Sequence, residues 1–175
     1  MSNSLAENII LIGMMASGKS AVGKELALKL GREFLDTDLL AEQIAGMTIP
    51  NLFDSRGEGC FRDYESEIIA DLNDYNQGTL VVATGGGAVM RKENRKNLSR
   101  AGLLVYLKAR PGVIVKRALK EGGRPLLEVD NPEEAVRRIL AEREPYYSIN
   151  DISIDTGSKS VKEVAEEILK KMQGS

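Results

Sequence analysis

The chain has 175 residues, of which 42% are hydrophobic and 29% charged, and its net charge is −2. This length and composition are typical of one globular domain, and the charge argues against general nucleic-acid binding, which needs a basic face. There is no histidine and only one cysteine, Cys60, which excludes histidine-dependent hydrolases, the usual zinc enzymes and an internal disulfide. Neither a signal peptide nor a membrane-spanning run is recognisable, so we expect a cytoplasmic protein that does not bind membranes.

Short apolar runs that predict strands alternate with segments of helical periodicity along the whole chain. The predicted strands cover residues 8–12, 33–35, 79–83, 103–107 and 151–154. Between them, apolar residues recur at spacings of three and four, most clearly after residue 160. This alternation predicts right-handed crossovers and a parallel sheet with helices on both faces. We therefore expect an α/β fold of three layers, α-β-α, in a single domain that covers residues 1–175.

A glycine-rich loop follows the first predicted strand. Residues Gly13 to Ser20 (GMMASGKS) fit the phosphate-loop pattern G-x-x-x-x-G-K-[ST], and an amphipathic helix is predicted from about Lys19 to Leu30. Gly13 and Gly18 allow a backbone that turns N–H groups toward phosphate oxygens. Lys19 can reach the outer phosphates, and Ser20 can bind Mg²⁺. A chance glycine turn would rarely lie between such a strand and helix, so we predict binding of a nucleoside triphosphate.

Two carboxylates, Asp36 and Asp38, end the second predicted strand in the segment EFLDTD. In an extended chain they would point to the same side, which is unfavourable unless a cation lies near them. The GTPase motifs D-x-x-G and N-K-x-D do not appear, and Thr84 stands where many ATPases have a metal-binding acid. Asp36 is therefore the candidate metal ligand. Asp38 is left for another role, although it also fits an ordinary N-cap for a helix that begins at Leu39.

Two further features lie in loops, and each has a functional and an ordinary interpretation. Gly85 to Gly87 follow the third predicted strand, where they allow close approach of the backbone to a ligand or form a tight, inert connection. Arg124 lies in the excursion 121–131 (EGGRPLLEVDN). A mobile lid at this place would bring an arginine to the transferring phosphate.

Three charged residues on predicted helices look unremarkable on their own. Arg62 and Glu65 are three positions apart in GEGCFRDYESE and share a helix face. As an exposed ion pair they would contribute only about 0.3 kcal/mol to stability. Arg143, in AEREPYY, looks like an ordinary exposed helix charge.

Together, the motifs resemble those of shikimate kinases. The phosphate loop, D-T-D, F-R-x-x-E, A-T-G-G-G, R-P-L and R-x-P-x-Y occur in this order from about Asn8 to Lys170. The phosphate loop alone is shared with many families, whereas R-x-x-E with T-G-G-G at this spacing is far more specific. The resemblance implies a nucleoside-monophosphate-kinase-like fold with five parallel strands in the order 2-3-1-4-5. It also implies transfer of the ATP γ-phosphoryl group to the 3-hydroxyl of shikimate, a step in chorismate and aromatic amino acid biosynthesis.

The resemblance also implies a role for each matching residue. The implied catalytic residues are Lys19, Asp38 and Arg124. The implied ATP-binding residues are Gly13, Ala16, Ser17, Gly18, Lys19, Ser20, Ala21, Arg117, Arg124 and Lys159. The implied shikimate-binding residues are Asp38, Arg62, Glu65, Gly85, Gly86, Gly87 and Arg143. The Mg²⁺ ligands predicted from the motifs themselves are Ser20 and Asp36.

Within this set, Arg62 and Arg143 would bind the shikimate carboxylate, and Glu65 would hold Arg62 in place. Arg117 would flank adenine, and Lys159 is the weakest candidate because its loop, DTGSKS, is less distinctive. The implied substrate-binding helical segment covers about residues 38–73, and the implied lid about 121–131. We expect a monomer whose partners are ATP, shikimate and Mg²⁺.

Two other functions are compatible with a phosphate loop. Gluconate kinase shares the fold, but it is not expected to contain both R-x-x-E and T-G-G-G. A catalytically silent ATP-binding module would be favoured by loss of Lys19, Asp38 or Arg124, all of which are present.

Overall fold

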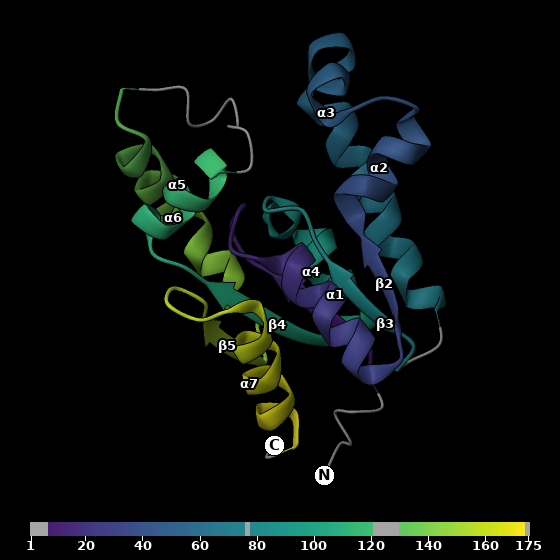
Figure 1. The fold of residues 1–175 in the computed structure, drawn as a ribbon. Coiled ribbons are helices and arrows are strands. Elements are labelled where there is room, and N and C mark those ends of the chain that lie inside the picture. The colour runs from purple at the N-terminus through teal and green to yellow at the C-terminus, as the bar shows by residue number, and fades with distance from the viewer. Residues whose placement is uncertain (1–6, 76–77, 121–129, 174–175) are drawn as a thin grey trace.

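The computed structural model describes residues 7–75, 78–120 and 130–173, in which five parallel strands form one sheet (Figure 1). The strands are β1 Ile9–Ile12, β2 Glu33–Asp36, β3 Leu80–Ala83, β4 Leu103–Lys108 and β5 Ile152–Asp155. Their order is β2-β3-β1-β4-β5. The predicted strands and strand order are both confirmed. The strands were recognisable because short, continuous apolar runs are typical of parallel strands that are buried on both faces.

Helices cover both faces of this sheet, as the alternating pattern predicts. They are α1 Lys19–Leu30, α2 Thr37–Ala45, α3 Ile49–Asp71, α4 Lys92–Ala101, α5 Pro111–Lys120, α6 Pro132–Tyr147 and α7 Val161–Gln173, with the short 3₁₀ helices η2 Leu72–Asp74 and η3 Ala88–Met90. None of the helices in the described ranges is both long and apolar enough to cross a membrane.

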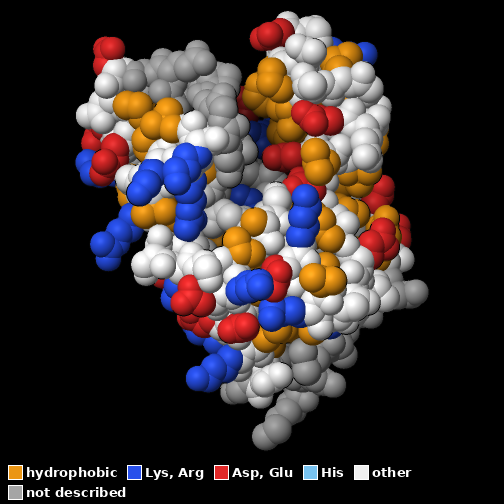
Figure 2. Space-filling model, in the orientation of Figure 1, with side chains coloured by type: hydrophobic (Ala, Val, Ile, Leu, Met, Phe, Trp, Pro, Cys, Tyr) orange, Lys and Arg blue, Asp and Glu red, His pale blue; other side chains and the backbone are white. Residues whose placement is uncertain are grey.

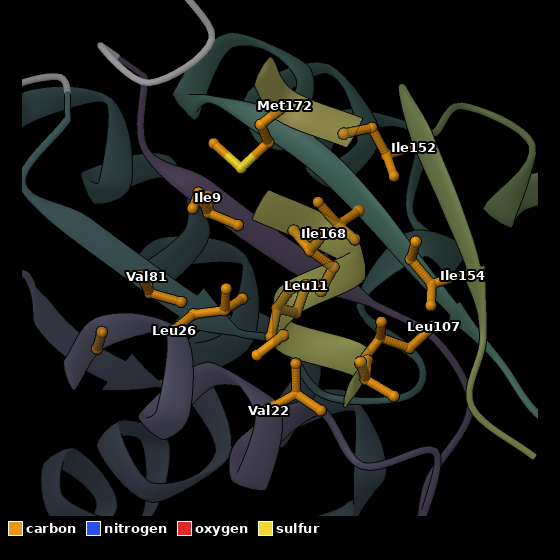
Figure 3. Packing of buried hydrophobic residues seen from close by; sticks show 14 residues of the cluster. Ile9, Leu11, Val22, Leu26, Val81, Leu107, Ile152, Ile154, Ile168 and Met172 are labelled. Carbon is orange, nitrogen blue, oxygen red and sulfur yellow. The ribbon is translucent and has the colours of Figure 1, made fainter. Parts of the chain in front are cut away.

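The side chains of β1 alternate between two hydrophobic cores. Ile9 and Leu11 lie in one cluster with residues of α1 and α7, such as Leu26 and Ile168 (Figure 3). Ile10 and Ile12 lie in a second cluster, which contains residues of α3, α4 and α6. All four β1 side chains are fully buried. The alternation follows from the two-residue period of a strand, and it fixes β1 as the centre of the three-layer fold.

Two pairs of helices extend beyond the strand ends. Helices α2 and α3 pack together around a separate cluster that includes Ala41, Leu52 and Phe61. Helices α5 and α6 form another pair, and Ile114 and Val136 pack there against Met14 of the phosphate loop. Figure 2 shows a hollow between the surfaces of these two pairs, with charged side chains of both signs in it. The carboxyl ends of parallel strands meet at one edge of a sheet, so the loops after β1, β2 and β3 converge near this hollow.

Candidate active site

The loop between β1 and α1 has the backbone that the phosphate-loop pattern predicts. Gly13 has a φ of 147° and Gly18 a φ of 101°, values that residues with a side chain rarely adopt. At Gly13 a Cβ atom would also lie 2.6 Å from the carbonyl oxygen of Leu107. Ala16 has a φ of 54°, in the left-handed region that is uncommon for non-glycine residues. The chain therefore makes a tight turn directly before the N-terminus of α1, a geometry suited to a phosphate group.

Lys19, the first residue of α1, lies across this loop. Its ammonium group donates hydrogen bonds to the carbonyl oxygens of Gly13 at 2.7 Å and Met14 at 2.8 Å. The residue is 8% exposed. The charge is thus held at the loop, where it can interact with the outer phosphates of a nucleotide.

Ser20 and Asp36, the two predicted metal ligands, are in direct contact. The Ser20 hydroxyl donates to Asp36 Oδ2 at 2.6 Å. A hydroxyl beside a carboxylate is the kind of oxygen pair that suits Mg²⁺, whose other ligands are usually water and substrate phosphates. Within the described ranges, no group of three or more His, Cys, Asp or Glu side chains is arranged to hold a metal.

Asp36 is also the N-cap of α2, which corrects the expectation for Asp38. Its Oδ1 accepts hydrogen bonds from the backbone N–H groups of Asp38 at 3.0 Å and Leu39 at 3.4 Å. Helix α2 begins at Thr37, so Asp38 lies in its first turn, and the prediction that both carboxylates lie on one strand face is wrong. Asp36 is therefore the last residue of β2 and the N-cap of α2, whereas the Asp38 side chain extends from the first turn of α2.

Asp38 lies instead beside Glu65 and the glycine turn after β3. A Cβ atom at Gly85 would be 2.5 Å from Glu65 Oε1 and 2.6 Å from Asp38 Oδ1. The Gly85 N–H donates to Thr37 Oγ1 at 3.0 Å, which joins the turn to the start of α2. A side chain at Gly85 would therefore have to displace the carboxylate groups of Asp38 and Glu65.

Arg62 and Glu65 form a largely buried ion pair, so the prediction of an exposed one is wrong. Arg62 Nη1 donates to Glu65 Oε2 at 2.8 Å, and the Glu65 side chain is 1% exposed. Burial is the main reason that the pKa of Glu65 is raised above its ordinary value. Arg62 opposes that rise, while the negative charge of Asp38 adds to it. A second carboxylate, Glu58, accepts from Arg62 Nε at 3.1 Å and from Nη2 at 2.8 Å.

The other two glycines of the turn also pack tightly. A Cβ atom at Gly87 would lie 2.6 Å from both terminal nitrogens of Arg62, and one at Gly86 would lie 2.9 Å from the backbone nitrogen of Met15. Each glycine therefore makes room for a neighbouring group, and close approach of the turn to a ligand stays a prediction. The groups that approach closely belong to the chain itself, a cause that the sequence interpretation did not consider.

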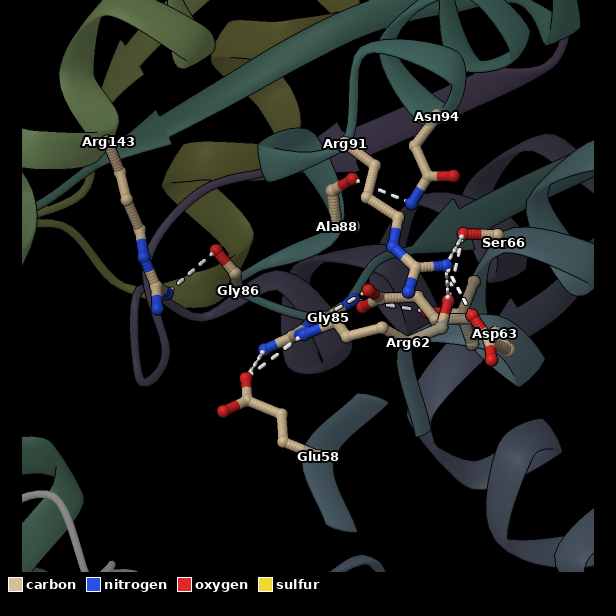
Figure 4. Close-up of polar contacts among 12 residues, drawn as sticks. Glu58, Arg62, Asp63, Ser66, Gly85, Gly86, Ala88, Arg91, Asn94 and Arg143 are labelled. Carbon is tan, nitrogen blue, oxygen red and sulfur yellow. Dashed lines mark hydrogen bonds and ion pairs between the residues drawn. The ribbon is translucent and has the colours of Figure 1, made fainter. Parts of the chain in front are cut away.

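Arg143 reaches the same turn from α6. It is half-buried, not an exposed helix charge, and its Nη1 donates to the Gly86 carbonyl oxygen at 3.2 Å. Figure 4 shows that Arg143 and Arg62 approach the glycine turn from different sides. Two guanidinium groups therefore border the turn at the end of β3, beside the phosphate loop.

The predicted adenine-side residues lie at the opposite end of the phosphate loop. Arg117 of α5 donates to the Ser17 carbonyl at 3.3 Å and to the Thr156 hydroxyl and carbonyl at 3.0 and 2.6 Å. The guanidinium thus joins the phosphate loop to the loop after β5. Lys159, in that same loop, pairs with Glu167 of α7 at 2.5 Å. Arg124 and most of the predicted lid lie outside the described residues.

Sequence reasoning assigned no role to several residues that build this site. Arg91 donates to the carbonyl oxygen of Arg62 at 2.9 Å and pairs with Asp63 at 2.8 Å, which supports the helix turn that presents Arg62 (Figure 4). Tyr147 donates its hydroxyl to Gly86 at 2.6 Å. Tyr147 is the tyrosine of the R-x-P-x-Y motif and could have been singled out, whereas no pattern pointed to Arg91.

The sequence and the fold are similar to those of known proteins. A family model described as shikimate kinase matches residues 15–173. The chain is 42% identical over 164 residues to a shikimate kinase from Caldanaerobacter subterraneus subsp. tengcongensis, which covers 94% of this chain and 95% of that protein. A solved shikimate kinase from Acinetobacter baumannii in complex with shikimate is 38% identical, with a TM-score of 0.91 over 98% of this chain and 95% of that one. A solved gluconokinase from Sinorhizobium meliloti 1021 is 16% identical, with a TM-score of 0.59 over 97% of this chain and 93% of that one. This similarity shows a shared fold alone.

Proposed function

The chain belongs to the shikimate kinase family, and we propose that it transfers the γ-phosphoryl group of ATP to the 3-hydroxyl of shikimate. It is an ATP-dependent kinase that acts on shikimate, and the products of the proposed reaction are 3-phosphoshikimate and ADP. The main structural support is the pair Arg62 and Arg143, which border the glycine turn next to the phosphate loop. A small polyhydroxy acid needs such arginines for its carboxylate.

We assign ATP binding to the phosphate loop and α1. The backbone from Gly13 to Ser20, together with Ala21, would surround the β- and γ-phosphates, and the Lys19 ammonium would balance their charge. Because Lys19 is held by two loop carbonyls, it needs little rearrangement to reach the phosphates. Arg117, which joins the loops on the other side, would flank adenine, and Lys159 is a further candidate there.

Shikimate would lie against the glycine turn. Arg62 and Arg143 would bind its carboxylate, and Glu65 would hold Arg62 by their ion pair. Asp38 Oδ1, which lies against Gly85, would accept a hydrogen bond from the attacking hydroxyl and orient its oxygen toward the γ-phosphorus. As the new P–O bond forms and the bond to ADP breaks, Asp38 would take the hydroxyl proton, late in a loose transition state.

Ser20 and Asp36 would hold Mg²⁺, because their oxygens are adjacent and match the ligands that this cation prefers. When bound, the cation would neutralise part of the phosphate charge. Asp36 would thus bind the metal, and Asp38 would bind the substrate hydroxyl. The N-cap role of Asp36 is compatible with it, since the cap uses Oδ1 and Ser20 contacts Oδ2.

Further parts of the proposal come from the family resemblance. They are the substrate-binding segment at about 38–73, a lid at about 121–131 that brings Arg124 to the transferring phosphate, a cytoplasmic monomer, and a place in the route to chorismate. The structure describes α2 and α3 in the first of these segments.

A coupled assay for ADP release tests the proposal. The purified chain with ATP and Mg²⁺ should release ADP rapidly with shikimate, slowly with gluconate and slowly with neither. Faster release with gluconate would favour the gluconate kinase alternative. No release with either acid, together with measurable ATP binding, would favour a silent ATP-binding module.

A further inference from the structure

Tyr147, the last residue of α6, is a buried hydrogen-bond donor beside the proposed carboxylate site. Its hydroxyl donates to the Gly86 carbonyl oxygen at 2.6 Å, and the residue is 0% exposed. Burial raises the pKa of this hydroxyl to about 12, so it remains a donor at neutral pH. This hydroxyl is not among the groups assigned to bind shikimate.

Tyr147 is held firmly from two sides. Its ring stacks on that of Tyr106 in β4, with centroids 4.7 Å apart and planes 18° apart. Its backbone carbonyl accepts hydrogen bonds from Asn150, from the backbone nitrogen at 3.3 Å and from Nδ2 at 2.8 Å. The hydroxyl therefore has a fixed position, although it lies at a helix end, where fraying is common.

The Gly86 carbonyl accepts from two side chains of different kinds. Tyr147 is buried and rigid, and its hydrogen bond is 2.6 Å long. Arg143 is half-buried, and its bond to the same oxygen is 3.2 Å long. If Arg143 were the sole donor, moving its guanidinium onto a substrate carboxylate would leave a backbone carbonyl unsatisfied, which is unfavourable at a half-buried position. Because Tyr147 also donates to this carbonyl, Arg143 can give up its hydrogen bond to Gly86 at little cost in free energy.

The same hydrogen bond orients a peptide group in the turn. The peptide between Gly86 and Gly87 is planar, so its N–H points away from its carbonyl. Fixing the carbonyl on α6 through Tyr147 directs the Gly87 N–H to the other side of the turn. Gly87 contacts the Arg62 guanidinium, since a Cβ atom there would lie 2.6 Å from two of its nitrogens. Tyr147 thus influences both ends of the proposed carboxylate site.

We infer that Tyr147 is a positioning residue for shikimate, which anchors the Gly86 carbonyl so that Arg143 is free to bind the substrate carboxylate. This inference rests on the proposed function. It assigns Tyr147 no contact with substrate, so its effect should appear in the affinity for shikimate and not in the affinity for ATP.

The chain offers a matched control in the same aromatic stack. Tyr106 is also buried, but its hydroxyl donates to Glu144 Oε2 at 2.7 Å, away from the glycine turn. Tyr147→Phe and Tyr106→Phe each remove one buried hydroxyl and leave the stacked rings in place. Tyr147→Phe should weaken shikimate binding about five- to thirtyfold, as expected for the loss of one hydrogen bond to a half-buried carbonyl. Tyr106→Phe should not change it.

Two measurements compare these variants with the wild type. Calorimetric titration gives the Kd for shikimate, and steady-state kinetics give the KM values for shikimate and ATP. A rise in shikimate Kd in Tyr147→Phe alone, with an unchanged KM for ATP, would support the inference. Unchanged affinity in Tyr147→Phe, or an equal loss in both variants, would overturn it. The effect of Tyr147→Phe should also be smaller in an Arg143→Lys background, and full additivity of the two changes would contradict the inference.

If the wild-type chain bound no shikimate, the proposed function would fail, whatever the variants did. If Tyr147→Phe did not fold, NMR of the wild-type chain would decide. The Tyr147 hydroxyl proton should resist exchange with water both before and after shikimate is added. Loss of that protection on adding shikimate would overturn the inference.

Discussion

At the scale of single residues, the central feature is that two arginines from different helices border one glycine turn. Arg62 comes from α3 and Arg143 from α6. Arg62 is paired with Glu65 and Glu58, so its geometry is set before any substrate binds. Arg143 bonds to a backbone carbonyl. In the proposed function, this arrangement would place one guanidinium group on each side of the shikimate carboxylate.

Replacing either arginine with lysine tests the carboxylate assignment. Arg62→Lys and Arg143→Lys keep the charge but lose the planar, two-pronged donor geometry. We expect the KM for shikimate to rise about tenfold or more in each, since a charge-assisted hydrogen bond contributes about 1.5–3 kcal/mol. The KM for ATP should stay nearly unchanged. Unaltered shikimate KM in both variants would assign these arginines a purely structural role.

Asp36 and Asp38 should respond differently to the same change. Asp38→Asn removes the proposed base and should lower kcat by about 10²- to 10⁴-fold. Asp36→Asn should keep the helix cap, because asparagine caps as well as aspartate does. Its defect should depend on Mg²⁺ and be partly rescued by more metal.

The measurement is a Mg²⁺ titration of kcat at saturating ATP and shikimate for both variants. Rescue of Asp38→Asn by Mg²⁺ would reverse the assignment. Full activity in both would leave Asp36 as a helix cap and Asp38 without a catalytic role.

Glu65 gives a prediction for the pH dependence of stability. Its pKa in the folded chain lies above the ordinary value of 4.5, mainly through burial, so the folded state holds the proton more tightly than the unfolded state does. Its contribution to stability is therefore present below about pH 4.5 and is lost as pH rises through the folded-state pKa. Glu65→Gln cannot ionise, so its Tm should match that of the wild type at low pH and exceed it increasingly as pH rises.

Thermal unfolding of the wild type and of Glu65→Gln from pH 4 to 8 tests whether the difference in Tm grows in the expected direction. A wild-type Tm that rises relative to Glu65→Gln over this range would mean that Arg62 stabilises the carboxylate by more than burial disfavours it.

At the scale of elements, α3 has a kink before the turn that carries Arg62. Gly57, inside this helix, has a φ of 81° and a ψ of 161°. Gly59 is two positions later in the same helix and has no positive φ. At both positions an added Cβ atom would meet open space, so only the backbone conformation distinguishes them.

Alanine at these two glycines should therefore change stability in opposite directions. Gly57→Ala should destabilise the chain by about 1–3 kcal/mol, because a positive φ combined with an extended ψ is essentially restricted to glycine. Gly59→Ala should stabilise it by up to about 1 kcal/mol through higher helix propensity. A Tm change of roughly 2–4 °C per kcal/mol is expected at this length. Equal changes in both variants would contradict the kink.

The sequence predicted the strands better than it predicted the start of α2. Continuous apolar runs mark strands without reference to distant residues, so all five were recognised. Asp36 and Asp38 are equally good N-caps by residue type, and local pattern cannot choose between them. The choice depends on β2, which pairs with β3 through residue Asp36, so the helix can begin only after it.

At the scale of the whole molecule, the site combines loops from the ends of three neighbouring strands with helices from both sides of a hollow (Figures 1 and 2). The motifs identified most of the residues that the structure brings together. They could not give the burial of Glu65 or its position beside Asp38 and Gly85. These depend on contacts between α2, α3 and the loop after β3, which are distant in sequence.

The most direct test of the central claim is the position of the phosphate in the product. The chain is incubated with ATP, Mg²⁺ and shikimate, and the product is examined by ³¹P–¹H correlation NMR. We predict a single new phosphomonoester signal, coupled to the proton on carbon 3 of shikimate. A phosphate on another hydroxyl, or release of inorganic phosphate with unchanged shikimate, would contradict the proposed reaction.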